Sequence, residues 1–438
     1  MGTPLSFNDD RTDGRDDYAY GNDGRKRGGA GDGATGDNRA ATMLFVVAVA
    51  ALLGLIFSGV STSDFIEHLD RQVHSIHCSF IPGANKELGD NGCKTVMMST
   101  YSSLLRTSLW GGIPIALLSV ATFANLLMKS LQLALAEKIT RNDTLFLVVA
   151  WALPVVTSLI FGAIAATQIG ALCKLCVGIY IASALGFALS IVAHMKATTT
   201  TEQMPLSKYG IWFGEGVVYV VVMVVFYVLF APSAPKSLEG CGTLVKRDDP
   251  NGVFIPMSRG NGVTAIAVVD PLCPACKGFD ERLHASALDQ QVALNAVLFP
   301  LDSSCNWMVK ESLHPGACAV SEAMLCAKED SADAALDVLD WAFKNQERLR
   351  EAAKVNEGDV RAEIVRTFPK VKDCLGSSKI KNKVNKSLRW AVTNALPVLT
   401  PQLFIGDKRV CDEDTDLGLE YTVTQLLEDA KSSRRSGR

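Results

Sequence analysis

Three pairs of cysteines have a residue type and spacing that suit thiol–disulfide exchange. Cys273 and Cys276 enclose Pro-Ala, Cys173 and Cys176 enclose Lys-Leu, and Cys78 lies upstream of Cys93. A thiolate attacks a disulfide sulfur through a mixed disulfide, so a cysteine pair can alternate between dithiol and disulfide. The alternatives for a pair three residues apart are a structural disulfide and half of a zinc site. A bridge between residues three apart on a helix constrains little, and the histidines do not stand at zinc-like spacing, so redox chemistry is favoured.

The pair Cys273–Cys276 lies at the predicted start of a helix, a position that favours thiolate formation. Residues 263–270 ("VTAIAVVD") read as a buried β-strand, and the cysteines directly open the helix that follows. A helix N-terminus offers unpaired N–H groups and a positive dipole end, which lower a thiol pKa and favour the thiolate. We therefore expect Cys273 to be the nucleophile and Cys276 to resolve the mixed disulfide.

Five apolar segments are long enough to cross a membrane. The chain has 438 residues, which is too long for one small domain, and 48% of them are hydrophobic, which is more than is typical of a soluble protein. A spanning helix needs about 20 apolar residues. The first segment has a cleaved signal peptide as its alternative, which its place after a long acidic tail disfavours. The predicted spans are 41–60, 109–130, 144–166, 172–193 and 212–231.

The odd number of spans puts the two termini on opposite sides of the membrane. The 61–108 loop, the 166–173 hairpin and the region after 232 then share one side and hold all twelve cysteines. Lysines and arginines are more frequent on the other side, which makes the N-terminal tail cytoplasmic. Cysteine usage favours an oxidising extracytoplasmic compartment for the opposite side. A net charge of −3 gives no reason to expect nucleic acid as a partner.

The region after 236 reads as a soluble α/β domain. A second strand covers 291–300, a long helical pattern runs from about 309 to 390, and a strand follows Pro401 before a closing helix. The order strand, Cys273-Pro274-Ala275-Cys276, helix and then Thr400-Pro401-strand resembles the thioredoxin fold with the helical insertion of periplasmic disulfide oxidoreductases. The resemblance implies that Pro401 is cis and that Thr400 and Pro401 contact the substrate chain.

The membrane part resembles the vitamin K epoxide reductase family in its bacterial form fused to a thioredoxin-like domain. The loop cysteine pair, "CKLCVGIY" and the span count carry the resemblance. It implies that Ser99, six residues after Cys93, is the family's loop serine, and that Tyr180, four after Cys176, contacts a quinone. Helix capping and an interfacial tyrosine belt are the respective alternatives. The fourteen residues between Cys78 and Cys93 exceed the usual family spacing, and a static bridge is the alternative for this pair.

The family implies a membrane thiol–quinone oxidoreductase that makes disulfides in exported proteins. Electrons would pass from Cys273–Cys276 through Cys78–Cys93 to Cys173–Cys176, and from there to a ubiquinone- or menaquinone-type acceptor, without a metal. Its partners would be the lipid bilayer and exported cysteine-containing proteins. The main alternative is an anchored thiol-exchange protein without quinone chemistry. A carrier of electrons outward from the cytoplasm would need a cysteine on the cytoplasmic side, and the sequence places none there.

Six further cysteines and two isolated charges remain. Six cysteines allow 15 pairings, so the pairs Cys305–Cys318, Cys326–Cys374 and Cys241–Cys411 are only one choice. Glu215 and His314 are expected on solvated or interfacial surface without a role. The fold class is thus five transmembrane helices, with a four-helix-bundle catalytic core, followed by a soluble thioredoxin-like domain. The expected divisions are a disordered cytoplasmic tail (1–40), the membrane domain (41–200), the fifth helix and a linker (201–235), the extracytoplasmic domain (236–430) and a tail (431–438).

Overall fold

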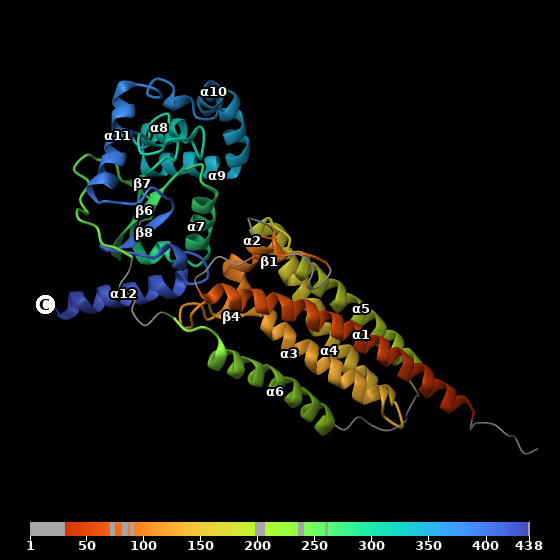
Figure 1. Ribbon diagram of the computed structural model, residues 1–438. Helices are drawn as coiled ribbons and strands as arrows, with labels where there is room; N and C mark the ends of the chain where they lie inside the picture. The colour runs from red at the N-terminus through yellow and green to blue at the C-terminus, as the bar shows by residue number, and fades with distance from the viewer. Residues whose placement is uncertain are drawn as a thin grey trace, which may run out of the picture.

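The protein consists of a long helical bundle with a soluble α/β domain seated on one of its ends (Figure 1). A computed structural model provides the coordinates. The structure describes residues 31–70, 75–80, 86–87, 92–197, 206–234, 241–258 and 262–436.

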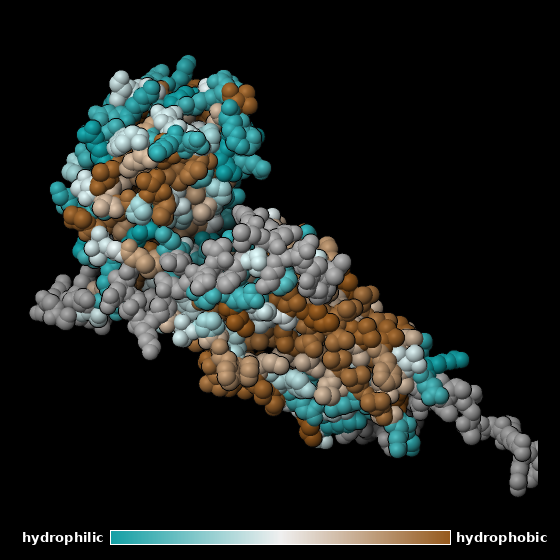
Figure 2. Space-filling view, viewed as in Figure 1, coloured by the Kyte–Doolittle hydropathy of each residue, from teal (hydrophilic) through white to brown (hydrophobic). Residues whose placement is uncertain are grey.

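Five helices of the described chain are long and apolar enough to span a membrane, as the sequence predicted. They are α1 (Gly31–Glu67), α3 (Ile115–Ala134), α4 (Arg141–Ile164), α5 (Lys174–Lys196) and α6 (Leu206–Phe230). Figure 2 shows hydrophobic side chains covering the flank of this bundle, whereas the soluble domain is mostly hydrophilic. An apolar flank of this kind is what contact with lipid requires.

Helices α1, α3, α4 and α5 pack on one another, and α6 lies against α3 on the outside. Glycines let aromatic rings approach the helix backbones. A methyl group at Gly54 would lie 2.5 Å from the Phe123 ring, and one at Gly186 would lie 2.1 Å from the Trp151 ring. Small residues at such contacts are typical of packing between membrane helices.

Charged side chains, Glu215 among them, join the N-terminal half of α6 to the bundle. Glu215 forms an ion pair with the buried Lys129 of α3, and Lys208 forms one with Asp143 of α4. Both lysine amines also lie within 5 Å of the Trp212 ring centroid, at 4.9 and 4.7 Å. Glu215 is 44% exposed, in agreement with the expected surface position, but it is not isolated, because it pairs with a lysine of a helix far away in the sequence.

Three predicted boundaries need correction. Residues 31–40 are helical as the first part of α1 and so are not a disordered tail; residues 1–30 lie outside the described residues. The second span begins at Ile115 instead of 109, because Gly111 (φ 68°) and Gly112 (φ 75°) turn the chain there in a conformation that favours glycine. At the C-terminus the last helix continues to Ser436, past the predicted end at 430.

Short elements cover the bundle end that faces the soluble domain. Their backbone turns bring the loop after α1, the loop before α3 and the α4–α5 connection together there (Figure 1). They are η1 (His68–Asp70), β1 (Ile76–His77), β2 (Lys86–Glu87), α2 (Gly92–Met98), η2 (Thr100–Ser102), β3 (Ser103–Leu104), β4 (Ile113–Pro114) and the π-helical turn η3 (Ala165–Ile169).

The soluble domain is built on a five-stranded sheet in the order β5-β7-β6-β8-β9. The central strand β6 pairs parallel with β7 and antiparallel with β8, and its apolar residues are buried almost throughout. A parallel pair requires a crossover, which here is helix α7 (Pro274–Ala285). The strands are β5 (Ile255–Pro256), β6 (Val263–Val269), β7 (Val292–Leu298), β8 (Gln402–Ile405) and β9 (Lys408–Arg409).

Four helices are inserted between β7 and β8, and a fifth closes the domain (Figure 1). Helix α8 is buried along its whole length and forms the centre of the insertion. This arrangement confirms the predicted thioredoxin-like domain with a helical insertion. The elements are α8 (Ala317–Ala327), α9 (Ala332–Val355), α10 (Glu357–Thr367), α11 (Ser378–Thr393) and α12 (Leu419–Ser436), with short turns η4 (Asp289–Gln291), η5 (Pro369–Val371) and η6 (Asp412–Asp414).

The start of α12 docks on the loop that precedes α3. The guanidinium of Arg106 donates to the Glu420 carboxylate at 3.1 Å, and both side chains are about 5% exposed. Beside this ion pair, the rings of Trp110 and Tyr421 meet edge to face with centroids 5.8 Å apart. A methyl group at Gly418 would lie 2.4 Å from the Trp110 ring. The contact therefore combines a buried charge pair with a close aromatic fit.

Candidate active site

Helix α7 begins at the pair Cys273–Cys276, with Cys273 at its N-cap and Pro274 in its first turn. Both cysteines are free and buried. The Cys273 thiol donates to the carbonyl oxygen of Thr400 at 3.6 Å, and the Asp270 N–H donates to the Cys276 sulfur at 3.4 Å. The Thr400–Pro401 peptide bond is cis and directly precedes β8. The fold thus places the predicted threonine and proline against the predicted nucleophile.

The two thiols of this pair differ in acidity. A hydrogen bond from the Cys276 thiol outweighs burial and lowers the pKa of Cys273 from 9.0 to about 6, with help from the Thr400 side chain. Burial, followed by the interaction with Cys273, raises the pKa of Cys276 well above 9.0. Cys273 is therefore largely thiolate near neutral pH and Cys276 is not, which are the properties of an attacking and a resolving thiol.

Cys78 and Cys93 form a disulfide and are both buried, at 3% and 2% exposure. Cys78 directly follows β1, and Cys93 is the second residue of α2. A carboxylate near the end of α1 holds the chain beside Cys78. Asp64, which is 1% exposed, accepts the backbone N–H of His77 at 3.0 Å and lies 2.7 Å from the Nδ1 of the His77 ring. The loop cysteine is thereby tied to the first membrane helix.

Cys173 and Cys176 open helix α5 in the same way as the soluble-domain pair opens α7. Cys173 is the N-cap residue, and its sulfur accepts the Cys176 backbone N–H at 3.4 Å. Both are free thiols. Immediately before them, the backbone of Leu172 passes so close to Gly92 that a methyl group there would lie 2.4 Å from the Leu172 carbonyl oxygen. This approach brings the chain at Cys93 beside the chain at Cys173.

One cavity of about 380 Å³ joins these groups inside the bundle. Its wall includes Cys93, Cys173 and Cys176 together with Tyr180 and Ser99; the rest is mainly apolar, with several serine and threonine residues. Its volume lies in the range of small-molecule sites, which are mostly apolar with a few polar groups. The structure thus brings five predicted site residues to one space.

Ser99 and Tyr180 both face this cavity. Ser99 stands at the N-cap of η2 but makes no side-chain capping bond; its hydroxyl donates to the Val96 carbonyl oxygen at 2.7 Å instead. Tyr180 lies one helical turn beyond Cys176, and its ring passes Gly162 of α4. The structure therefore does not favour the capping alternative for Ser99.

The remaining six cysteines form the three disulfides Cys241–Cys411, Cys305–Cys318 and Cys326–Cys374. These are the pairs that the sequence offered as one choice among several. In contrast to the loop and membrane pairs, Cys273 and Cys276 pack in the core of the soluble domain.

Sequence reasoning missed several polar residues around the cysteines. Asp64 and His77 hold the loop, Arg106 joins the two domains, and Asp270 is fully buried beside Cys273. A signal did exist for Asp64, because a carboxylate at the end of an apolar membrane helix needs a partner. The hydrogen-bond and ionic partners of these residues lie in distant segments of the chain, so the sequence could not predict the pairing. Among the described residues, no group of histidine, cysteine and acidic side chains is arranged to hold a metal.

Comparison with known proteins agrees with this architecture. Residues 45–191 match the vitamin K epoxide reductase family, and residues 260–424 match a thioredoxin family. The chain therefore joins a vitamin K epoxide reductase family domain to a thioredoxin-like domain, and it is a multi-pass membrane thiol–disulfide oxidoreductase.

Other comparisons add little. No curated protein matches the chain. A solved structure, a linker-deletion mutant of Proteus mirabilis ScsC, is 17% identical, with a TM-score of 0.29, over 40% of this chain and 74% of its own.

Proposed function

We propose that the protein generates disulfides in exported proteins and passes the electrons to a membrane quinone. The order of transfer is from a substrate dithiol to Cys273–Cys276, then to Cys78–Cys93, then to Cys173–Cys176. One observation carries the proposal: a cysteine of the loop pair and both cysteines of the membrane pair line the same cavity. Cys93, and not Cys78, lines that cavity and is therefore assigned the attack on Cys173.

Each transfer conserves atoms and electrons. A thiolate attacks one sulfur of the next disulfide, a mixed disulfide forms, and the resolving thiolate releases the attacking chain as a disulfide. Two electrons move at each step, and the pair that received them becomes a dithiol. At the last step Cys173 and Cys176 return to a disulfide and give up two electrons and two protons, which a quinone accepts as it becomes a quinol.

The residues of the cavity fit a quinone of ubiquinone or menaquinone type. Its walls are mainly apolar, as an aromatic ring requires, and the Tyr180 hydroxyl is a hydrogen-bond donor on the same helix as Cys176. We assign Tyr180 to donate to a quinone carbonyl oxygen. Ser99 is assigned to hold the pocket wall, where its hydroxyl fixes the end of α2 through Val96.

We further propose that the soluble domain is extracytoplasmic and acts on exported cysteine-containing proteins. Four disulfides in the structure suit an oxidising compartment. Arginine and lysine are frequent in the N-terminal tail, which the odd number of spans puts on the other side. Membrane-impermeant maleimide, applied to intact cells after reduction, should label Cys241 and Cys411 and leave unlabelled a cysteine introduced at Ala136, an exposed residue between α3 and α4. The reverse pattern would contradict the orientation.

The replacement Cys176→Ala tests the relay. Without Cys176, the Cys173 thiolate attacks Cys93 of the Cys78–Cys93 disulfide, which forms the Cys93–Cys173 crosslink and releases the Cys78 thiol. No second membrane thiol can then displace Cys93, so this crosslink should accumulate and quinone reduction by a dithiol substrate should stop. Non-reducing peptide mapping reads the crosslink, and quinone absorbance reads the turnover in purified protein with its lipids. The matched control is Cys273 in the same variant, which should still exchange with a small disulfide.

The competing function is an anchored thiol-exchange protein whose helices only hold it in the membrane. It predicts that Cys176→Ala leaves substrate oxidation at the wild-type rate and produces no crosslink. Free thiols that line an internal cavity would have no use in such a protein, and this favours the relay.

A further inference from the structure

The buried carboxylate of Asp270 lies directly beneath the cysteine pair of the soluble domain. Asp270 follows β6 and is 0% exposed. Its carboxylate accepts the N–H groups of Leu272 and Leu301, each at 2.7 Å, and the ring Nδ1 of His314 at 2.8 Å. His314, which sequence reasoning placed on the surface without a role, is therefore the ionic partner of a buried acid.

Asp270 touches both ends of the cysteine pair through its backbone. Its carbonyl oxygen accepts the Cys273 N–H at 3.2 Å, and its own N–H donates to the Cys276 sulfur at 3.4 Å. A carboxylate in this place disfavours a second negative charge on Cys273, and its effect is to raise the pKa of that thiol. A positive charge beside Asp270 would offset this effect and favour the Cys273 thiolate further.

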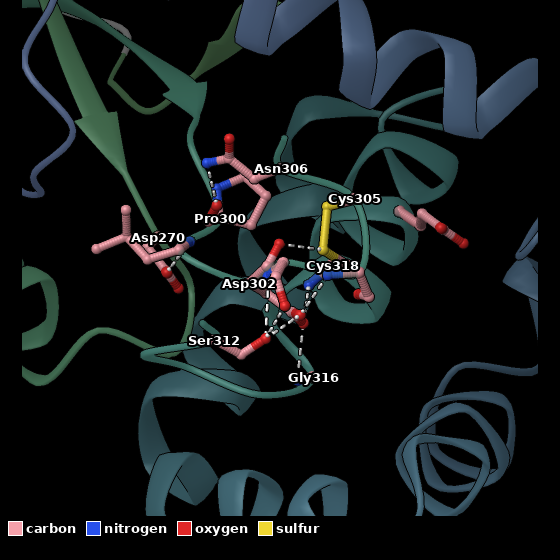
Figure 3. Close-up of a disulfide and its surroundings, with 12 residues drawn as sticks. Asp270, Pro300, Asp302, Cys305, Asn306, Ser312, Gly316 and Cys318 are labelled. Carbon is pink, nitrogen blue, oxygen red and sulfur yellow. Dashed lines mark hydrogen bonds between the residues drawn. A yellow bond between two sulfur atoms is a disulfide. The ribbon is translucent and has the colours of Figure 1, made fainter. Parts of the chain in front are cut away.

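The loop that presents His314 is held by a buried carboxylate and a disulfide. The Asp302 carboxylate, 2% exposed, accepts the Gly316 N–H at 2.9 Å and the Ser312 hydroxyl at 3.0 Å. The Cys305–Cys318 disulfide closes the same loop. Figure 3 shows Asp302 pointing into this loop beside the disulfide, with Asp270 on the neighbouring strand end. The loop thereby fixes the position of the imidazole between these anchors.

The charges around His314 favour its protonated form. Burial lowers the pKa of His314, but the hydrogen bond and charge of Asp270, together with the charge of Cys273, outweigh burial and the repulsion from Arg350 and raise it. These groups come from the end of β6, from α7 and from α9. An imidazolium therefore stands within electrostatic reach of the attacking sulfur.

We propose that His314 is a positioning residue for the Cys273–Cys276 pair: its positive charge offsets the buried Asp270 carboxylate and so preserves the Cys273 thiolate. The proposal rests on thiol exchange at Cys273, the first step of the proposed function. Under this proposal, the loop between Asp302 and Cys318 has the function of holding His314 beside Asp270. Neither the disulfide of the loop nor its position at the surface explains such a function.

The test is the pH profile of Cys273 alkylation in the full-length protein. The Cys273–Cys276 pair is reduced, iodoacetamide is added at a series of pH values, and mass spectrometry of the Cys273 peptide gives the rate. The wild-type midpoint is expected near pH 6, the value to which the pKa of Cys273 falls. His314→Gln keeps an N–H donor for Asp270 but carries no charge. We expect its midpoint to rise by about one pH unit, so that alkylation at pH 6 is about fivefold slower.

Two further variants separate charge from packing. His314→Lys keeps a cation and should retain a midpoint near the wild type. His284→Gln is the matched control, because His284 also pairs with a carboxylate, Asp280 at 3.4 Å, but lies at the other end of α7 and is 54% exposed. It should leave the profile unchanged. Peptide mapping of the Cys305–Cys318 disulfide checks that each variant is folded, and His314→Asn replaces any His314→Gln protein that is not.

Two results would overturn the proposal. One is an unchanged midpoint in folded His314→Gln; the other is an equal shift in His314→Gln and His314→Lys, which would mean that packing and not charge sets the profile. Alkylation at Cys273 needs neither a quinone nor another cysteine pair. A failure of the relay would therefore leave this readout intact, and the two proposals can fail separately.

Discussion

At the scale of single residues, the most informative position is Gly92. It lies directly before Cys93, and its missing side chain allows the Leu172 carbonyl oxygen to approach. The identities of the cysteines were readable from the sequence, because their spacing and their places after strand and loop patterns indicate redox pairs. The approach at Gly92 was not readable, because a glycine in a loop signals a turn as readily as a close contact.

We expect Gly92→Ala to slow electron transfer between the loop and membrane pairs. A methyl group 2.4 Å from the Leu172 oxygen must push the two backbones apart, and Cys93 moves with them. A misplacement of about 1 Å costs on the order of 100-fold in rate at a reacting centre. The measurement is the rate at which the Cys93–Cys173 crosslink forms in the Cys176→Ala protein.

The matched control for this experiment is Gly59→Ala. Gly59 belongs to α1, and a methyl group there would meet no atom within 4 Å. Crosslinking at the parent rate in both glycine variants would show that the approach at Gly92 is not needed for the transfer.

At the scale of elements, the apolar segments and the strand–CPAC–helix pattern predicted the architecture well. Hydropathy measures how long a segment can stay in lipid, so it found all five spans. It does not show where hydrogen bonds end a helix, and Trp110 illustrates the limit: this apolar residue was counted in the second span. Trp110 instead lies in the loop before α3, and its indole N–H donates to the Leu69 carbonyl oxygen at 2.9 Å.

Partners between elements were the other gap. Glu215 and His314 looked isolated because Lys129 and Asp270 are remote in the sequence and belong to other elements. A single sequence gives residue types and periodicity but not which helix faces which. In both cases the physical rule that a buried charge is paired holds, and the pairing needed tertiary structure.

At the scale of the whole molecule, a continuous set of contacts runs from the soluble domain to the cavity wall. Arg282 of α7 donates from Nε to the Thr415 carbonyl oxygen at 3.1 Å, just before α12. Glu420 of α12 binds Arg106, whose other nitrogen donates to the Ser99 carbonyl oxygen at 2.5 Å. The helix that carries Cys273 and the serine that lines the cavity are therefore held in one arrangement. We propose that this docking holds the soluble domain where Cys273 can exchange with the loop pair.

Gly418→Ala tests whether the docking serves the relay. The added methyl group would lie 2.4 Å from the Trp110 ring, and the ring cannot easily yield because its N–H is bonded to Leu69. We expect the domains to separate at this contact and electron transfer from Cys273 to the loop pair to slow by roughly tenfold, because the second reaction partner is no longer held in place. Trapping of the interdomain mixed disulfide in a Cys276→Ser background measures that step.

Quinone reduction driven by a small dithiol that reaches Cys78–Cys93 directly should be unchanged, since it bypasses the docked domain. Gly210→Ala, where a methyl group meets no atom within 4 Å, is the control. Equal trapping in the Gly418→Ala and Gly210→Ala proteins would show that the soluble domain finds the loop pair without this contact, and the tether of α6 alone would then account for its delivery.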